Sequence, residues 1–133
     1  MYYCNSTSIQ RGDFLAWSFS NSSPVYLQIA ERIIISILAG EYLAGQQLPT
    51  VRQLALSAAV NPNTVQHAYT YLETEGIIIS KGTLGRFVTE DDKQLEIGRK
   101  HLAEKIVKEF MCKLDSLAIT KAEAIKLIKE VEL

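Results

Sequence analysis

The stretch LPTVRQLALSAAVNPNTVQHAYTYLETEG, residues 48–76, decides the fold that we predict for this chain. Thr50 and Gln53 show the pattern of a capping box, in which each side chain satisfies a backbone N–H of the other residue at the start of a helix. Asn61 followed by Pro62 marks a second start, because asparagine is a good cap and proline fits the first helical turn. The stretch therefore predicts a short helix, a tight turn and a second helix.

The second of these helices has one polar and one apolar side. Its inward positions are mostly apolar and recur at helical spacing: Val65, Ala68, Tyr69 and Leu72. Its start carries hydrogen-bonding side chains instead: Asn61, Asn63, Thr64, Gln66 and His67. We expect the helix to run to about Glu75 and to end at Gly76, which suits a left-handed C-terminal cap. A polar, exposed start on an otherwise packed helix is what a DNA-recognition helix requires.

Elements on both sides extend this pattern. Upstream, Ser23-Pro24 predicts a helix start with a hydroxyl cap and a proline at the first position, and Gly40 ends that helix. Downstream, the β-branched run 77–79 and the segment 86–88 flank a glycine-containing tip and predict a two-stranded hairpin. We therefore predict a mainly α fold with a small β-hairpin, arranged as a winged helix-turn-helix.

The C-terminal third has a different composition and predicts two further helices. Acidic residues at 90–92 favour a helix N-terminus, and a long apolar stripe follows them. Thr120 and Glu123 repeat the capping-box pattern and open the last helix. These helices carry more apolar surface than a small DNA-binding unit needs, so we expect them to form a homodimer interface. The residues that we expect in this interface are Ile106, Phe110, Leu114, Ile125 and Ile128.

The predicted organisation has three parts. We expect an N-terminal arm at 1–23 that is partly loose, a winged helix-turn-helix DNA-binding domain at 24–89, and a two-helix dimerisation segment at 90–133. Residues 14–19 within the arm have extended character and predict a short edge strand. With 133 residues, the chain is long enough for one modest core and too short for two full domains.

Composition and cysteine usage narrow the class of protein. The chain is 47% hydrophobic and 22% charged with a formal net charge of −1, which is typical of an ordinary soluble protein. Cys4 and Cys112 share no metal-ligand or redox spacing with each other or with His67 and His101, so we expect no metal site and a reducing, cytoplasmic location. No signal peptide or membrane-spanning run is visible in the sequence. We find no nucleophile with a base, phosphate loop or carboxylate pair that would make an enzyme, and we expect no cofactor.

Several ordered motifs in residues 24–88 resemble the GntR family of bacterial regulators. They are Leu48-Pro49-Thr50-Val51-Arg52-Gln53-Leu54-Ala55, Val60-Asn61-Pro62-Asn63-Thr64-Val65, Glu75-Gly76-Ile77 and Gly85-Arg86-Phe87-Val88. The short two-helix tail, with no large ligand-binding domain, resembles the YtrA-like subfamily. The resemblance implies a transcriptional regulator whose third helix enters the major groove and whose wing touches the adjacent backbone or minor groove.

The resemblance also assigns roles to individual residues. Members of the family use the arginine that stands here as Arg52 on phosphate and a guanine edge, and the wing glycine, here Gly85, lets the hairpin backbone approach DNA closely. The start of the third helix contacts bases and phosphates. On this basis we predict the following DNA-contacting residues: Thr50, Arg52, Asn61, Asn63, Thr64, Gln66, His67, Lys81, Gly85 and Arg86. Chemistry agrees, because arginine suits guanine and asparagine or glutamine suits adenine.

Each of these residues also has a purely structural alternative. Arg52 could form a surface ion pair, Asn61 could serve only as a helix cap, and the polar residues that follow it could simply be solvated. Lys81 and Arg86 could only blunt an exposed hairpin edge. The usual wing threonine of the family is replaced by Arg86, and residues 46–88 carry only three cations against two glutamates. We therefore expect few phosphate contacts.

The sequence leads to one main hypothesis on function and one alternative. We expect a sequence-specific, DNA-binding transcriptional regulator, a repressor, that binds an inverted-repeat operator as a homodimer. The alternative is a winged helix that makes protein contacts and leaves its DNA face unused, which the near-neutral charge favours. No residue identifies an effector pocket, so a small-molecule effector of unknown identity is left open. We expect no contact with a membrane.

Overall fold

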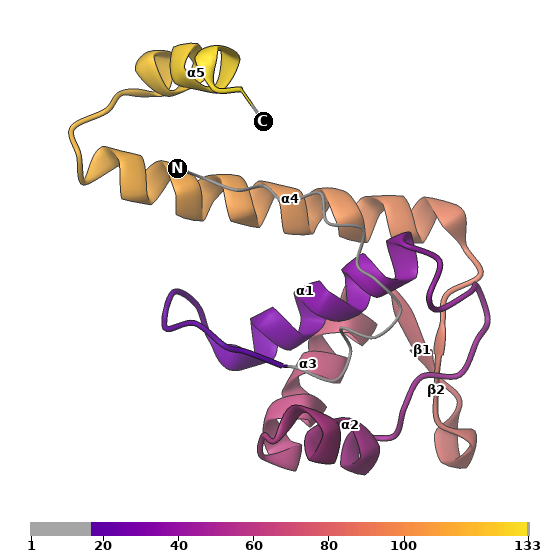
Figure 1. The fold of residues 1–133 in the computed structure, drawn as a ribbon. Helices are drawn as coiled ribbons and strands as arrows, with labels where there is room; N and C mark the ends of the chain where they lie inside the picture. Colours follow the sequence, from indigo (N-terminus) through magenta and orange to yellow (C-terminus); the bar gives the residue numbers. More distant parts are fainter. Residues whose placement is uncertain (1–16, 133) are drawn as a thin grey trace.

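The computed structural model describes residues 17–132, and it is mainly helical with one small antiparallel hairpin (Figure 1). The elements are α1 (Val25–Leu38), α2 (Val51–Ala58), α3 (Pro62–Thr74), β1 (Ile78–Ser80), β2 (Arg86–Val88), α4 (Asp92–Asp115) and α5 (Lys121–Glu130). This order confirms the predicted fold class. Residues 1–16 of the predicted arm, including half of the predicted strand at 14–19, lie outside the described residues, and 17–23 form no helix or strand.

The helix starts at α2, α3 and α5 are confirmed in atomic detail. The hydroxyl of Thr50 accepts a hydrogen bond of 3.1 Å from the backbone N–H of Gln53, whose side chain accepts one of 2.9 Å from the backbone N–H of Thr50. Asn61 caps α3 by accepting a bond of 2.8 Å from the N–H of Asn63. At α5, Thr120 heads a second capping box. These helices begin where local side chains satisfy free N–H groups.

The start of α1 differs from the prediction. Pro24 is itself the residue before the first helical turn, and no side chain caps this end, so the expected hydroxyl cap from Ser23 is wrong. The side chain of Gln28, in the first turn of α1, instead holds the preceding segment. Its amide nitrogen donates bonds of 2.9 and 2.7 Å to the carbonyl oxygens of Ser20 and Ser23. These bonds fix how the chain enters α1, but they do not satisfy the free N–H groups of the helix.

The core lies where α1 crosses α3 (Figure 1). Tyr69 of α3 is fully buried there, as predicted from its inward position, and its hydroxyl donates a bond of 2.6 Å to the carbonyl oxygen of Pro49. The other fully buried large side chains are Ile29, Ile34, Val65, Leu72, Ile77, Ile78 and Val88. Helices α1 and α3 and both hairpin strands therefore share one apolar centre.

The hairpin is extended by a segment that the sequence analysis missed. Residues 45–48, between α1 and α2, run beside β2 and exchange backbone bonds with it. The N–H of Leu48 donates to the carbonyl of Arg86 at 2.8 Å, and the N–H of Val88 donates to the carbonyl of Gln46 at 2.9 Å. Backbone hydrogen bonds therefore hold the wing, formed by β1 and β2, against the segment that leads into α2.

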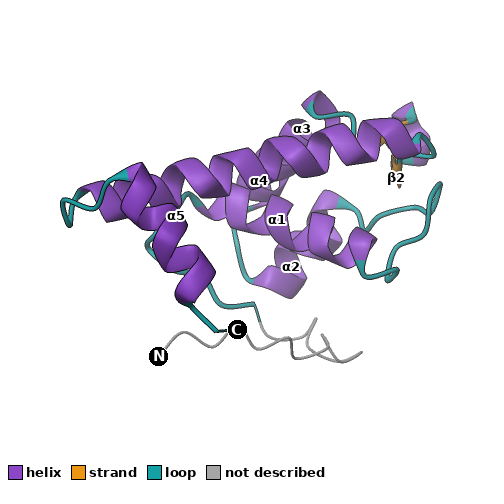
Figure 2. Ribbon diagram, turned by 90° about the horizontal axis from the view of Figure 1, so that it is seen from above, coloured by secondary structure: helices purple, strands orange, loops and turns teal. Residues whose placement is uncertain are grey.

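Helix α4 is capped by Asp91, whose side chain accepts bonds from two N–H groups of the first turn, and the helix then passes over α1 (Figures 1 and 2). Leu102 is its one large apolar side chain in the core. Gly98 lies against Ile77, so close that an added Cβ would come within 2.5 Å of Ile77 Cγ1. Because glycine inside a helix costs stability relative to alanine, this contact explains its presence.

Candidate nucleic-acid interface

The predicted contact residues gather mostly around the start of α3. Asn61, Asn63, Gln66 and His67 are exposed and Thr64 is half-buried. Arg52 of α2 is also exposed and lines the same shallow surface hollow as Pro62, the first residue of α3. The fold therefore brings an arginine and a row of hydrogen-bonding side chains onto one surface.

Two of the predicted residues have their side chains engaged in caps. The hydroxyl of Thr50 is the acceptor in the capping box of α2, and the side-chain oxygen of Asn61 caps α3. Each is exposed, so each still offers a donor group to a partner. Capping is the role that the structure shows for both.

His67 is held against α1. Its ring stacks on Tyr26 with the centroids 3.6 Å apart and the planes 14° from parallel. Tyr26 in turn meets the ring of Tyr71 edge-on at 6.3 Å. This aromatic group joins α1 to α3 and restricts the directions in which His67 can present its nitrogens.

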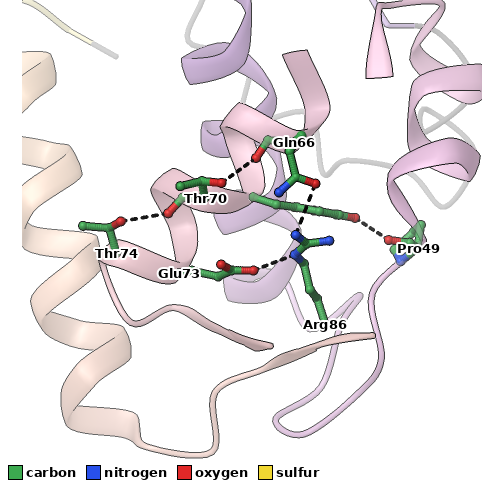
Figure 3. Close-up of polar contacts among 7 residues, drawn as sticks. Pro49, Gln66, Thr70, Glu73, Thr74 and Arg86 are labelled. Carbon is green, nitrogen blue, oxygen red and sulfur yellow. Dashed lines mark hydrogen bonds and ion pairs between the residues drawn. The ribbon is translucent and has the colours of Figure 1, made fainter. Parts of the chain in front are cut away.

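Arg86, at the start of β2, turns back onto α3 instead of standing free (Figure 3). Its Nε donates to the carboxylate of Glu73 at 2.6 Å, and its terminal nitrogen donates to the side-chain oxygen of Gln66 at 3.3 Å. The guanidinium carbon also lies 5.1 Å from the centre of the Tyr69 ring. Sequence analysis missed this arrangement, although the spacing of seven between Gln66 and Glu73 places them on one helix face.

Burial changes the pKa of Tyr69, which lies beneath Arg86. It raises the pKa of the Tyr69 phenol strongly, Tyr42 raises it further, and the cation of Arg86 opposes both effects. The phenol therefore keeps its proton at any physiological pH and remains the donor to Pro49. Tyr69 supports the interface from below and has no exposed surface of its own.

The wing presents Lys81 and Gly85 differently. Lys81 is exposed, with its nitrogen 4.5 Å from the centre of the Phe87 ring. Gly85 has a φ of +107°, and an added Cβ would lie 2.9 Å from the amide nitrogen of Gln47, which donates to the carbonyl of Leu84 at 2.8 Å. The positive φ already favours glycine at Gly85, independently of any DNA, whereas the Gln47 side chain could move aside.

The residues predicted for the dimer interface lie on α4 and α5, away from α3. Ile106, Phe110, Ile125 and Ile128 are between 41% and 60% exposed, and Leu114 is half-buried. Ala124 is the one buried side chain of α5. These two helices therefore carry an apolar surface that the other described residues, 17–132, leave exposed.

The described part of the chain offers no cluster of three or more histidine, cysteine or acidic residues suited to a metal ion. Within the same residues, no helix is long and apolar enough to cross a membrane.

Comparison with known proteins shows the family to which the chain belongs. Residues 25–88 match the family described as bacterial regulatory proteins, gntR family. YhcF of Bacillus subtilis, named an uncharacterized HTH-type transcriptional regulator, is 34% identical over 84% of this chain and 92% of its own length. The chain belongs to the GntR family.

Other GntR-type proteins show the same similarity. YtrA of Bacillus subtilis, named a transcriptional repressor, is 31% identical over 84% of this chain and 86% of its own. A GntR-family regulator from Listeria monocytogenes superposes with a TM-score of 0.66 at 37% identity, over 86% of this chain and all of that chain. The AraR DNA-binding domain, solved in complex with operator ORX1, superposes with a TM-score of 0.53 at 29% identity, over 56% of this chain and 96% of that domain.

These findings confirm the predicted family, its YtrA-like form and the winged helix-turn-helix fold. The GntR-family chain is a transcriptional regulator with a DNA-binding domain, and it is not an enzyme.

Proposed function

We propose that this GntR-family protein is a repressor that binds an inverted-repeat operator as a homodimer, with α3 in the major groove and the wing beside it. The observation that carries the proposal is the exposed start of α3 next to Arg52. Asn63, Thr64 and Gln66 supply donors and acceptors for base edges, and arginine is the side chain best matched to guanine. Phosphate contacts would come from Lys81 and from backbone N–H groups of the wing.

The exposed apolar surface of α4 and α5 supports the dimer. A second copy of the chain would cover Phe110 and Ile128, which are 41% and 60% exposed in the single chain. Two-fold symmetry in the protein then requires two half-sites in inverted orientation, about one helical turn or a multiple apart. The division into a DNA-binding domain at 24–89 and a dimerisation segment at 90–133 is part of this proposal.

Repression is supported by the similarity to YtrA, which is named a repressor. The match covers 84% of this chain and 86% of that relative, so the similarity extends beyond the helix-turn-helix into the C-terminal helices.

The test is a binding titration with labelled DNA from upstream of the protein's own operon, together with footprinting. We expect two protected half-sites on one operator and much weaker binding to a scrambled duplex. Arg52→Ala should lose about 1–3 kcal/mol of operator affinity and relax the base preference at one position in each half-site. Arg99→Ala is the matched control, because Arg99 is an exposed arginine of α4 paired with Glu96.

Two outcomes would contradict the proposal. Equal binding to operator and scrambled DNA would favour the alternative of a protein-interaction module. Unchanged affinity of the Arg52→Ala variant would remove Arg52 from the interface.

A further inference from the structure

The side chain of Arg86 is the wing's link to the recognition helix, and its environment is unusual for a DNA-contacting cation. Its side chain is 22% exposed and that of its partner Glu73 is 29% exposed. The 2.6 Å bond between them joins residues 13 positions apart, from β2 to α3 (Figure 3). A partly buried, hydrogen-bonded pair of this kind is held more firmly than a surface ion pair.

The pair argues against a phosphate contact by Arg86. To reach a phosphate, the guanidinium would have to leave Glu73, whose carboxylate would then stand without its partner next to a polyanion. Breaking a partly buried pair in this way is costly because it leaves an uncompensated charge. We therefore expect Arg86 to remain paired with Glu73 on α3 when DNA binds.

The second contact of Arg86 sets the orientation of the Gln66 amide. A guanidinium has donors only, so the group of Gln66 that faces it at 3.3 Å must be the oxygen. The amide nitrogen of Gln66 has no hydrogen-bond partner among the described residues, and Gln66 is exposed. Gln66 is thus oriented with its oxygen toward Arg86 and its amide nitrogen free to donate to DNA.

We propose that Arg86 is a positioning residue that sets the base preference of Gln66. A free glutamine pairs with adenine by using both its oxygen and its nitrogen. With its oxygen turned toward Arg86, Gln66 directs its amide N–H donors at DNA. This favours guanine, with the two acceptors N7 and O6, and thymine, with O4, over adenine, whose N7 acceptor lies beside an N6 amino donor. This inference rests on the proposed function, since it concerns how the same α3 surface reads its operator.

The test measures competition binding of the full-length protein against operators varied at each base pair. Arg86→Met frees the oxygen of Gln66, so adenine should gain about threefold to tenfold over guanine or thymine at one position in each half-site. The salt dependence should not change. Arg86→Lys should behave like Arg86→Met, because an ammonium group cannot reproduce the two-pronged contact.

The Gln66→Glu variant tests the role of the Gln66 amide donor while Arg86 is kept. The carboxylate still accepts from Arg86 but has no donor left, so the preference for guanine or thymine at that position should disappear. Lys81→Met is the matched control, because it removes an exposed wing cation and should weaken all sequences alike. Thermal unfolding of each variant separates folding defects from changes in preference.

Failure of the inference is distinct from failure of the proposed function. If neither Arg86→Met nor Arg86→Lys changes the base preference at any position, or if Arg86→Met flattens the salt slope as the loss of a phosphate contact would, the inference is overturned. A Gln66→Glu profile identical to that of the wild type overturns it as well, while selective operator binding still supports the proposed function. If the wild-type protein does not distinguish operator from scrambled DNA, both ideas fail together.

Discussion

The hydroxyl of Tyr69 in α3 donates a 2.6 Å hydrogen bond to the main-chain carbonyl oxygen of Pro49, one residue before the cap of α2. This single contact joins the two helices of the helix-turn-helix at a point far from the turn between them. It also places a buried phenol directly beneath Arg86, whose guanidinium carbon lies 5.1 Å from the ring centre.

The first prediction follows from that bond. Tyr69→Phe keeps the buried ring but removes the donor, so the free energy of unfolding should fall by about 1–2 kcal/mol. Urea denaturation followed by circular dichroism measures this. Tyr71→Phe is the control and should change the midpoint little, because Tyr71 is only half-buried and its hydroxyl makes no hydrogen bond within residues 17–132. Equal effects of the two changes would mean that the bond to Pro49 contributes nothing.

The second prediction concerns assembly. Phe110→Glu puts a charge into the exposed apolar surface of α4 and should convert a dimer into a monomer at micromolar concentration, because burying an unpaired carboxylate in an interface is costly. Sedimentation velocity reports the change. Cys112→Glu, which adds the same charge at an exposed position two residues from Phe110 and therefore on another face of α4, should leave the dimer intact. A wild-type protein that is monomeric with and without DNA would contradict the proposed dimer.

The third prediction concerns pH and Glu31, which lies in α1 beneath α4. Burial raises the pKa of its carboxyl group, and Glu109 raises it further while Lys105 lowers it. Because the folded state binds this proton more tightly than the unfolded state, the free energy of unfolding falls as pH rises from the ordinary to the raised pKa. Glu31→Gln removes this dependence.

The Glu31→Gln variant should therefore gain stability relative to the wild type as pH rises across that window, and keep the gain at neutral pH. Denaturation midpoints between about pH 4 and pH 7 measure the difference. Lys105→Met removes the opposing cation and should enlarge the pH-dependent loss of the wild type. A difference between Glu31→Gln and wild type that is the same at every pH would exclude this cause.

The fourth prediction is a shallow salt dependence of operator binding. Residues 46–88 carry three cations, and Arg86 is paired with Glu73, so Arg52 and Lys81 remain for DNA. Each phosphate contact contributes about 0.9 to the slope of log affinity against log salt, so a dimer should show a slope on the order of −4 to −6 when contacts from the C-terminal lysines are added. A slope steeper than about −8 would reveal a basic surface elsewhere in the protein.

Local signals account for the parts of the fold that the sequence predicts. The caps at Thr50, Asn61 and Thr120 act within three residues of themselves, so their patterns are readable without the rest of the structure. Tyr69 is inward by helical spacing alone. The start of α1 was predicted wrongly because Ser23 also matches a local cap, while the actual stabilising contact comes from Gln28.

The candidate site is less predictable, because its geometry depends on contacts between elements. The pairing of 45–48 with β2 has no periodic pattern, and it forms only when the wing folds back on the chain. Arg86 was predicted as a DNA contact on its wing position, but whether it turns toward DNA or toward Glu73 depends on how β2 packs on α3. The stacking of His67 on Tyr26 likewise requires α1 and α3 to cross.

The close approach of Gly98 to Ile77 has a consequence for operator geometry. It places α4 directly on Ile77, three residues after the end of α3, and the side chain of Gln94 donates a 2.8 Å bond to the carbonyl of Glu75, the C-cap of α3. If the α4 helices join two copies, each α3 is connected rigidly through α4 to the two-fold axis of the dimer. A base pair inserted between the half-sites would rotate one of them by about a tenth of a turn. A rigid connection through α4 could not follow that rotation. We therefore expect the regulator to bind operators with one half-site spacing and to bind much more weakly when a base pair is inserted or removed.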